Sequence, residues 1–348
     1  MIQRRAFLKS STAIALGAPI LSTRAQQSVT LKFHTFMSPA SNVWLHIHKM
    51  WMAKVEKESG GRIKFEGYPA MQLGGSPAQL YDQARDGVVD IAWTIPGMTP
   101  GRFPRTEVFE LPFMTNDAEG ASKATWEYLQ SMAPDEFKGV HVLAFHTHGR
   151  GLLHTKGKQI KNVTDMRGLK LRGSTRLVTK LLGAAGASPV GMPLPQITDA
   201  LSKGVIDGCA LPWEVIPSVK VDELAQFHSE FPSSGPALYN TTFAMVMNQT
   251  KYDSLPADLK KVIDDNSGLA TSALFGKIQQ DFDPISKKLA IDRGGVVYTF
   301  TEAETAEFIK LTSSIASEWT QEMNKRGFDG AKLLEGAKTL IAKYNKKT

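Results

Sequence analysis

The segment from residue 168 to residue 213 alternates short apolar runs with stretches of helical periodicity. Leu169 to Arg172 alternates apolar and basic residues, which predicts a short strand, and leucines at helical spacing follow over 176–185. A second strand is predicted over 189–192, a second helix over 197–203 and a third strand over 205–207. Strands and helices that alternate with short connections are typical of a parallel sheet. Ligands of such sheets bind at the carboxyl ends of the strands, where Arg172 and the segment 208–213 lie.

The rest of the chain continues this α/β pattern. Strands are predicted over 29–36, which we expect to be central, and over 63–68, 88–94, 141–147, 152–155, 227–232, 240–248 and 295–300. Helices are predicted over 43–58, 79–86, 118–132, 259–290 and 302–325. The pattern over 259–290 is unusually long for a helix of a globular protein.

Arg172 is a candidate anion clamp because its guanidinium can hold a carboxylate through two parallel hydrogen bonds with a permanent charge. The alternative is a surface arginine paired with a nearby acid such as Asp207. The position of Arg172 at a strand end, in the order of elements described above, favours the binding role.

The first residues have the pattern of an export signal. Arg4-Arg5 precedes a short apolar core over 13–21, and Thr23-Arg24-Ala25 has the form of a cleavage site. We expect a twin-arginine signal peptide over 1–25, with an ordinary Sec signal as the alternative, and therefore a periplasmic protein. No apolar run after it reaches the roughly 18 residues that a membrane span needs.

Charge and cysteine content narrow the possible functions. The chain has 41 basic and 34 acidic residues, and removal of the four bases of the signal leaves 37 against 34, a net charge of +3. Dispersed bases with so mild an excess predict no nucleic-acid partner.

The single cysteine, Cys209, excludes an internal disulfide. His146, His148 and His154 could form a metal site and Cys209 could be a nucleophile, but no matching carboxylates, phosphate loop or cofactor motif accompany them, so no metal or cofactor is expected.

The ordered set of motifs resembles the solute-binding proteins of tripartite ATP-independent periplasmic (TRAP) transporters, the DctP family. The strand of Arg172 is followed by Gly186-Ala187-Ser188-Pro189, Met192-Pro193 and Val205-Ile206-Asp207-Gly208, and Gln72-Leu73-Gly74 lies in the N-terminal half. The resemblance implies an α/β, two-lobed periplasmic-binding-protein-like fold with a cleft between the lobes and a long interlobe helix. We expect lobe I over 26–147 plus 237–277, and lobe II over 148–236 plus 278–348.

The resemblance also implies a site and partners. Arg172 would bind the substrate carboxylate, Arg150 would assist, the lobes would close on the ligand, and TRAP permease membrane subunits would receive it. The other wall would come from loops of the N-terminal half, with the candidates Phe36, Asn42, Gln72, Trp93 and Thr94.

Departures from the family pattern indicate the substrate. Leu211 stands where many members have an asparagine, Leu194 where many have a phenylalanine, and Trp213 follows closely. Such a site fits a monocarboxylate with an apolar or aromatic body. Tyr239 and Asn240 are candidates to hydrogen-bond a 2-hydroxy or 2-oxo group.

The alternative function is an exported metal- or thiol-dependent enzyme that uses the His146/His148 or Cys209 region.

Overall fold

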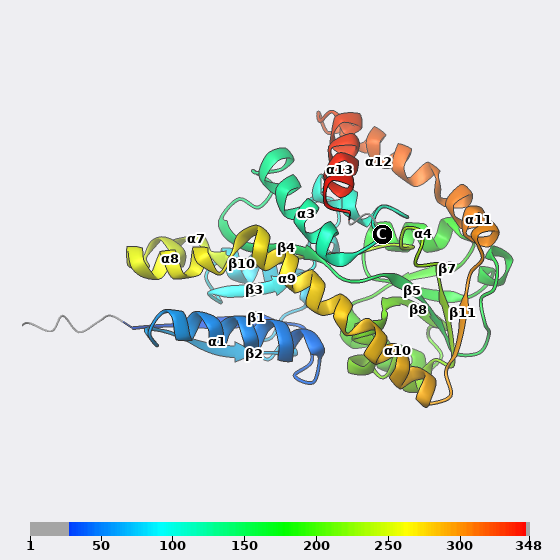
Figure 1. The fold of residues 1–348 in the computed structure, drawn as a ribbon, viewed down its shortest axis with the longest axis horizontal. Coiled ribbons are helices and arrows are strands. Elements are labelled where there is room, and N and C mark those ends of the chain that lie inside the picture. Colours follow the sequence, from blue (N-terminus) through cyan, green and yellow to red (C-terminus); the bar gives the residue numbers. More distant parts are fainter. Residues whose placement is uncertain (1–27, 346–348) are drawn as a thin grey trace, which may run out of the picture.

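The computed structural model describes residues 28–345 and contains two β-sheets flanked by helices (Figure 1). The first sheet has the strand order β2-β1-β3-β10-β4. Its strands are β1 (Val29–Thr35), β2 (Ile63–Tyr68), β3 (Ile91–Thr94), β4 (Val140–Thr147) and β10 (Thr242–Asn248). β1 pairs in parallel with β2 and β3, and β10 runs antiparallel to β3 and β4. The strand expected at the centre, β1, is therefore second in the sheet, and β3 is central.

The second sheet has the order β11-β9-β5-β8-β6-β7. Its strands are β5 (Gly151–Thr155), β6 (Lys170–Gly173), β7 (Ser188–Gly191), β8 (Gly208–Pro212), β9 (Phe227–Glu230) and β11 (Val296–Thr299). β7, β6 and β8 are parallel, which confirms the parallel unit predicted around Arg172.

The third strand of that unit was placed three residues too early, at 205–207. Val205 is half exposed, and Asp207 lies in a turn in which its carboxylate accepts a hydrogen bond from the backbone N–H of Lys170. The strand begins at Gly208, where a side chain would lie 2.3 Å from the carbonyl oxygen of His154 on the neighbouring strand. Only a glycine permits this close approach of β5 and β8.

Helices cover the sheets. The α-helices are α1 (Lys49–Glu58), α2 (Leu80–Arg85), α3 (Ala118–Met132), α4 (Arg176–Ala184), α5 (Ile197–Ser202), α6 (Val221–Leu224), α7 (Gln249–Asp253), α8 (Ala257–Asp265), α9 (Gly268–Asp281), α10 (Asp283–Asp292), α11 (Glu302–Thr312), α12 (Ser314–Lys325) and α13 (Gly330–Tyr344). Short π or 3₁₀ turns are η1 (Val43–His48), η2 (Pro77–Gln79), η3 (Pro96–Met98), η4 (Thr106–Glu110), η5 (Val163–Met166), η6 (Leu194–Gln196) and η7 (Trp213–Val219). The apolar faces of these elements meet the two sheets in the buried core.

The single helix expected over 259–290 is three helices. The chain turns between α8 and α9 at Gly268, whose φ is +86°, a value that favours glycine. It is interrupted again at Phe282, because Pro284 has no N–H for helical bonding. α9 packs on β4 and α3, whereas α10 packs on η7 behind the second sheet. The pair α9–α10 therefore connects the two halves, as expected of an interlobe helix (Figure 1).

The C-terminal helices return to the first half of the molecule. The helix predicted over 302–325 is divided into α11 and α12 near Thr312 and Ser313, whose hydroxyls donate to backbone carbonyls of the preceding turn. α11 packs beside α4, but α13 packs on α3 next to the first sheet. α13 belongs to the segment 278–348 that we expect in lobe II, yet it packs against α3 beside the first sheet, so the lobe bounds stay a prediction.

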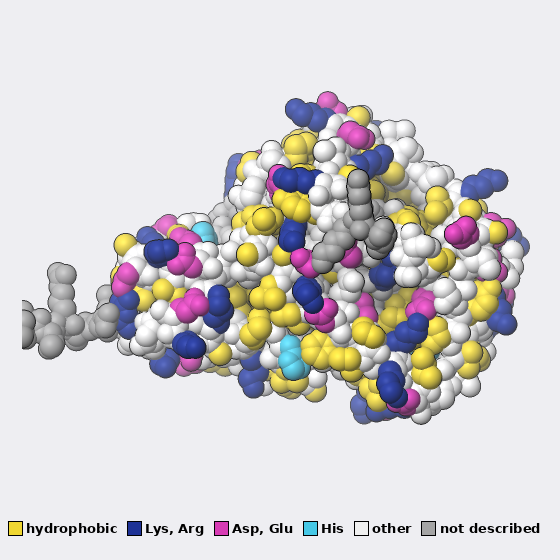
Figure 2. Space-filling view, in the orientation of Figure 1, with side chains coloured by type: hydrophobic (Ala, Val, Ile, Leu, Met, Phe, Trp, Pro, Cys, Tyr) yellow, Lys and Arg dark blue, Asp and Glu magenta, His cyan; other side chains and the backbone are white. Residues whose placement is uncertain are grey.

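The surface and the helix lengths add two observations. On the face shown in Figure 2, Lys and Arg side chains are interspersed with Asp and Glu, without a continuous patch of one sign. Within residues 28–345, every helix is too short or too polar to cross a bilayer. The predicted signal peptide, residues 1–25, lies outside the described part of the chain.

Candidate ligand-binding site

A buried cavity lies where the carboxyl ends of strands from both sheets meet. Six of the residues predicted as site residues line it: Phe36, Trp93, Arg172, Leu194, Leu211 and Tyr239. Ten further residues complete the lining: Met37, Ile95, His148, Ser174, Pro212, Glu214, Val215, Thr241, Phe243 and Gln279. Both halves of the molecule thus contribute to one mainly apolar site, which is the general character of small-molecule pockets.

Arg172 is the charged group of this cavity and is 1% exposed. Its Nε donates to the carbonyl oxygen of Met192 at 2.9 Å, and Nη1 donates to that of Ala210 at 3.3 Å. No carboxylate of the described chain forms an ion pair with it, and Asp207, the alternative partner, bonds to backbone instead. Burial lowers the pKa of Arg172, but guanidinium does not lose its proton in proteins. The cavity therefore holds an uncompensated positive charge, which an anionic ligand would neutralise.

Tyr239 lies beside this charge. Burial raises the pKa of its hydroxyl, and the guanidinium of Arg172 opposes that rise. The ring sits directly over Gly151, where a Cβ atom would be 2.3 Å from the ring. Ser174 and Thr241 both line the cavity, and their hydroxyls are within hydrogen-bond distance at 3.1 Å. Three hydroxyl-bearing side chains therefore line the same cavity as Arg172 and can supply further hydrogen bonds to a bound carboxylate.

An aromatic wall occupies the first-sheet side of the cavity. The rings of Trp93 and Phe243 are stacked, with centroids 4.5 Å apart and an interplanar angle of 12°. Phe36 packs on Trp93 at 5.5 Å. These positions follow from strand alternation, since Trp93 is on β3 and Phe243 is on the adjacent β10. Flat aromatic surfaces of this kind suit a flat apolar ligand.

A second polar group of the cavity is built from Glu214 and Gln279. The side-chain Nε2 of Gln279 donates to Oε1 of Glu214 at 3.0 Å, and both residues are 2% exposed. Burial, followed by the charge of Asp283, raises the pKa of Glu214 to about 8. Glu214 is therefore mainly protonated at neutral pH, and it is not the counter-ion of Arg172.

His148 lines the cavity as a neutral side chain. Its Nδ1 donates to the carbonyl oxygen of Gly149 at 2.7 Å, and burial lowers its pKa to about 4, with the charge of Arg172 contributing. His146 is neutral as well, because burial lowers its pKa to about 3. Its Nε2 accepts from Trp93 Nε1 at 3.0 Å. Both histidines thus have structural hydrogen-bond partners.

Two predicted site residues have structural partners outside the cavity. Arg150 donates to the carbonyl oxygens of Pro232, Gly235 and Pro236, so it holds a loop. Trp213 packs on His154 and His228, and its Nε1 donates to Glu230 at 3.1 Å. Neither residue is among those that line the cavity, and the ligand contacts of Arg150 and Trp213 stay predictions.

Four other candidates also lie outside the cavity lining. Asn240 donates to the carbonyls of His148 and Gly149 and accepts from Thr115, so its amide is fully engaged. Gln72 is exposed in the loop after β2. Thr94 bonds to the carbonyl of Pro77, and Asn42 bonds to the carbonyl of Glu214 at 3.1 Å. Asn42 joins the two halves without lining the cavity.

Sequence reasoning missed Glu214 and Gln279. Glu214 comes two residues after the end of β8 and Gln279 is 65 residues later on α9, so only the tertiary structure brings them together. Phe243 and Ile95 had a usable signal, since Ile95 directly follows the strand of Trp93 and Phe243 lies in a buried strand just after Tyr239 and Asn240.

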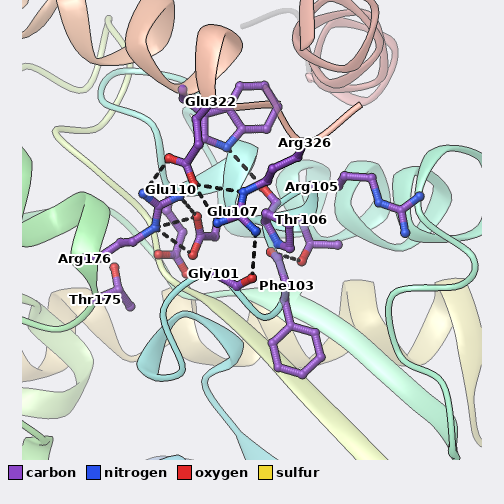
Figure 3. A network of polar contacts seen from close by, with 12 residues as sticks. Gly101, Phe103, Arg105, Thr106, Glu107, Glu110, Thr175, Arg176, Glu322 and Arg326 are labelled. Atoms are coloured by element: carbon purple, nitrogen blue, oxygen red, sulfur yellow. Dashed lines mark hydrogen bonds and ion pairs between the residues drawn. The ribbon is translucent and has the colours of Figure 1, made fainter. Parts of the chain in front are cut away.

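Ion pairs join the two halves beside the cavity (Figure 3). Arg176, the first residue of α4, donates through Nε to both carboxylate oxygens of Glu107 on η4, at 2.9 and 3.1 Å. Its Nη1 also contacts Glu322 of α12 at 2.8 Å. The side chain of Glu107 is 3% exposed, whereas that of Arg176 is 26% exposed. The pair therefore crosses between the halves with its acid buried.

The chemistry expected of the alternative enzyme finds little support at these residues. Cys209 is fully buried, and burial raises the pKa of its thiol to about 12, so it is protonated and inert at neutral pH. In the described part of the chain, no three His, Cys, Asp or Glu side chains are placed to hold a metal ion.

Glu214 gives a prediction for the pH dependence of stability. A buried acid whose pKa is raised stabilises the fold below its unfolded pKa, and this stability is lost as pH rises through about 8. Between pH 7 and 8 we expect the free energy of unfolding to fall in the unmodified protein by about 1 kcal/mol more than it falls in Glu214→Gln. Urea unfolding at both pH values measures this. Parallel declines in the two proteins would contradict it. The buried histidines are shared by both proteins and cancel in the comparison.

A two-lobed α/β molecule with a buried cationic cavity between its halves is a solute-binding protein of the periplasmic type. The chain belongs to the DctP family: the model of "Bacterial extracellular solute-binding protein, family 7" matches residues 33–322. This confirms the predicted family and fold. Family members of this type, including the C4-dicarboxylate-binding periplasmic protein of Rhodobacter capsulatus, are periplasmic; that relative is 24% identical over 96% of this chain and 94% of its own length.

Solved structures give closer likenesses. A TRAP solute-binding protein from Rhodoferax ferrireducens, in complex with copurified benzoate, is 61% identical with a TM-score of 0.90, over 91% of this chain and 98% of the other. A marine metagenome protein specific for aromatic acid ligands, in complex with 3-hydroxybenzoate, is 48% identical with a TM-score of 0.90, over 92% and 100%. A Bordetella bronchiseptica protein with bound (R)- and (S)-mandelate is 27% identical with a TM-score of 0.83, over 91% and 100%.

Proposed function

We propose that this protein is the periplasmic receptor of a TRAP transporter for aromatic monocarboxylates. The observation that carries the proposal is the buried guanidinium of Arg172, which has no carboxylate partner among the described residues and shares its cavity with aromatic and aliphatic side chains. A benzoate-like ligand supplies one negative charge for Arg172 and a flat apolar body for the wall formed by Trp93 and Phe243. The benzoate-bound and 3-hydroxybenzoate-bound relatives support this ligand class.

The proposed mechanism is binding by closure of the two halves, without bond chemistry. A ligand that touches both halves shifts the equilibrium toward the closed form by its differential affinity. The contacts of Asn42 with Glu214, of Ser174 with Thr241 and of Arg176 with Glu107 then join the halves. The closed receptor would deliver the acid to the membrane permease. Its export by the N-terminal signal is part of the proposal, as is its lack of enzymatic activity.

A thermal-shift screen of residues 26–348 tests the ligand class. Benzoate, phenylacetate and mandelate form one group, and succinate and galactonate form the other. A ligand at 100 times its dissociation constant adds about 2.7 kcal/mol of stability, which raises Tm by several degrees. We expect this shift from the aromatic acids, and none from benzamide, which has the shape of benzoate without its charge. A shift from succinate or galactonate alone would contradict the aromatic specificity while leaving the carboxylate clamp in place.

A further inference from the structure

A polar atom without a partner occurs at the Glu214–Gln279 pair. Oε2 of Glu214 is buried and has no hydrogen-bond partner in the described chain. Its Oε1 is engaged, because Nε2 of Gln279 donates to it. Leaving a buried polar atom unpaired costs about 1–3 kcal/mol, so the pair is incomplete without a further group.

The orientation of this pair is set by the residues behind it. Trp93 Nε1 can only donate, so Nε2 of His146 accepts its hydrogen bond and the ring proton is on Nδ1. The side chain of Gln279 hydrogen-bonds His146 and raises its pKa, so the Gln279 oxygen faces the proton on Nδ1. Gln279 is thereby held with its amide nitrogen toward Glu214. Oε2 of Glu214 is therefore available to form a hydrogen bond with a ligand in the cavity that this residue lines.

Arg172 and Glu214 serve different parts of a ligand. Both line the cavity, yet they form no ion pair with each other. Arg172 donates to the backbone carbonyls of Met192 and Ala210, whereas Glu214 accepts from Gln279. The carboxylate of a ligand at Arg172 therefore leaves Glu214 to meet another substituent of the same molecule.

We propose that Glu214, supported by Gln279, is a specificity-determining residue that binds a hydroxyl group on the ring of the aromatic acid. A hydroxyl suits this position because it can both donate and accept a hydrogen bond. It can therefore bond to Oε2 whether Glu214 is protonated or ionised. A methyl group of similar size at the same ring position leaves Oε2 unpaired. The preferred substrates are then hydroxylated aromatic monocarboxylates. This inference rests on the proposed function and deepens it.

Calorimetric titration with matched ligand pairs tests the inference. The ligands are benzoate, the three hydroxybenzoate isomers and the three methylbenzoate isomers. We expect one hydroxybenzoate to bind the unmodified protein about ten-fold more tightly than the methylbenzoate substituted at the same position. Glu214→Met should reduce this preference to less than about two-fold, measured as the ratio of the two affinities within the variant. Glu214→Gln, which keeps a hydrogen-bonding end of the same shape, should retain it.

The outcomes distinguish an error in the role of Glu214 from an error in the proposed function. If every methylbenzoate binds the unmodified protein as tightly as its hydroxylated counterpart, or if Glu214→Met keeps the preference, the role of Glu214 is wrong while aromatic binding stands. If neither benzoate nor any substituted benzoate binds, the proposed function itself fails. Should Glu214→Met not fold, Gln279→Met replaces it, and the comparison of ligand pairs on the unmodified protein still decides the question.

Discussion

Replacing Arg172 by methionine should lower the affinity for benzoate by two to four orders of magnitude. The guanidinium is buried, and its Nε and Nη1 are bound to backbone carbonyls, so the ligand carboxylate supplies the one negative charge that the site needs. Removing one partner of such a buried pair costs about 3–5 kcal/mol, and each 1.4 kcal/mol is about one decade of affinity. Calorimetric titration with benzoate measures the loss.

The matched control for this experiment is Lys170→Met. Lys170 is on the same strand, β6, but its side chain is exposed and outside the cavity. We expect its affinity to stay within about two-fold of the unmodified protein, since an exposed charge at that distance is screened. Unchanged affinity in Arg172→Met, with the fold confirmed by circular dichroism, would refute the carboxylate clamp.

Replacing Arg176 by methionine should weaken benzoate binding about a hundred-fold without touching the cavity lining. This side chain neutralises Glu107 across the two halves, and burial already raises the pKa of Glu107 while Arg176 lowers it. Loss of Arg176 leaves a buried acid unpaired in the closed form, which costs about 3 kcal/mol, the lower end of the range because Arg176 is partly exposed. Titration calorimetry again gives the affinity.

A double variant and a surface control identify the cause of this second effect. Adding Glu107→Gln to Arg176→Met removes the unpaired charge and should restore most of the lost affinity. Lys180 lies on the same helix and pairs with Glu318, but both side chains are more than one-third exposed, so Lys180→Met should change affinity less than about three-fold. If the double variant binds as weakly as Arg176→Met, the Arg176–Glu107 pair does not stabilise the closed form.

The sequence predicted most of the fold because its elements have strong local signals. Strand β2 and helix α3 begin and end at the predicted residues, since glycines, prolines and apolar periodicity mark their limits. The long helix over 259–290 was misjudged for the opposite reason. Its apolar residues continue with helical spacing past Gly268 and Pro284, and this periodicity was given more weight than the two helix-breaking residues.

Site residues on or near a predicted strand were easier to place than residues that follow a strand end. Arg172 and Leu211 both line the cavity; Arg172 was predicted from its place at a strand end, and Leu211 from a departure from the family pattern. Trp213 was proposed because it closely follows Leu211, but the strand ends at Pro212 and Trp213 begins a 3₁₀ turn outside the cavity lining. The direction of a side chain after a strand end depends on that turn, which the local sequence did not reveal.

Contacts between residues that are far apart in the chain could not be predicted from the sequence. Arg150 has the residue type of an anion ligand, and only the position of the loop over 232–236 shows that backbone carbonyls occupy its donors. Glu214 has the residue type that an anion site should exclude, and its burial with Gln279 gives it a separate use. Neither assignment follows from spacing along the chain.

A crystal structure of the protein grown with benzoate tests the central claim most directly. We predict the carboxylate at the guanidinium of Arg172, with N–O distances of about 2.7–2.9 Å, and the ring against Trp93 and Phe243. Benzoate bound elsewhere, or bound in this cavity with its carboxylate turned away from Arg172, would contradict the account.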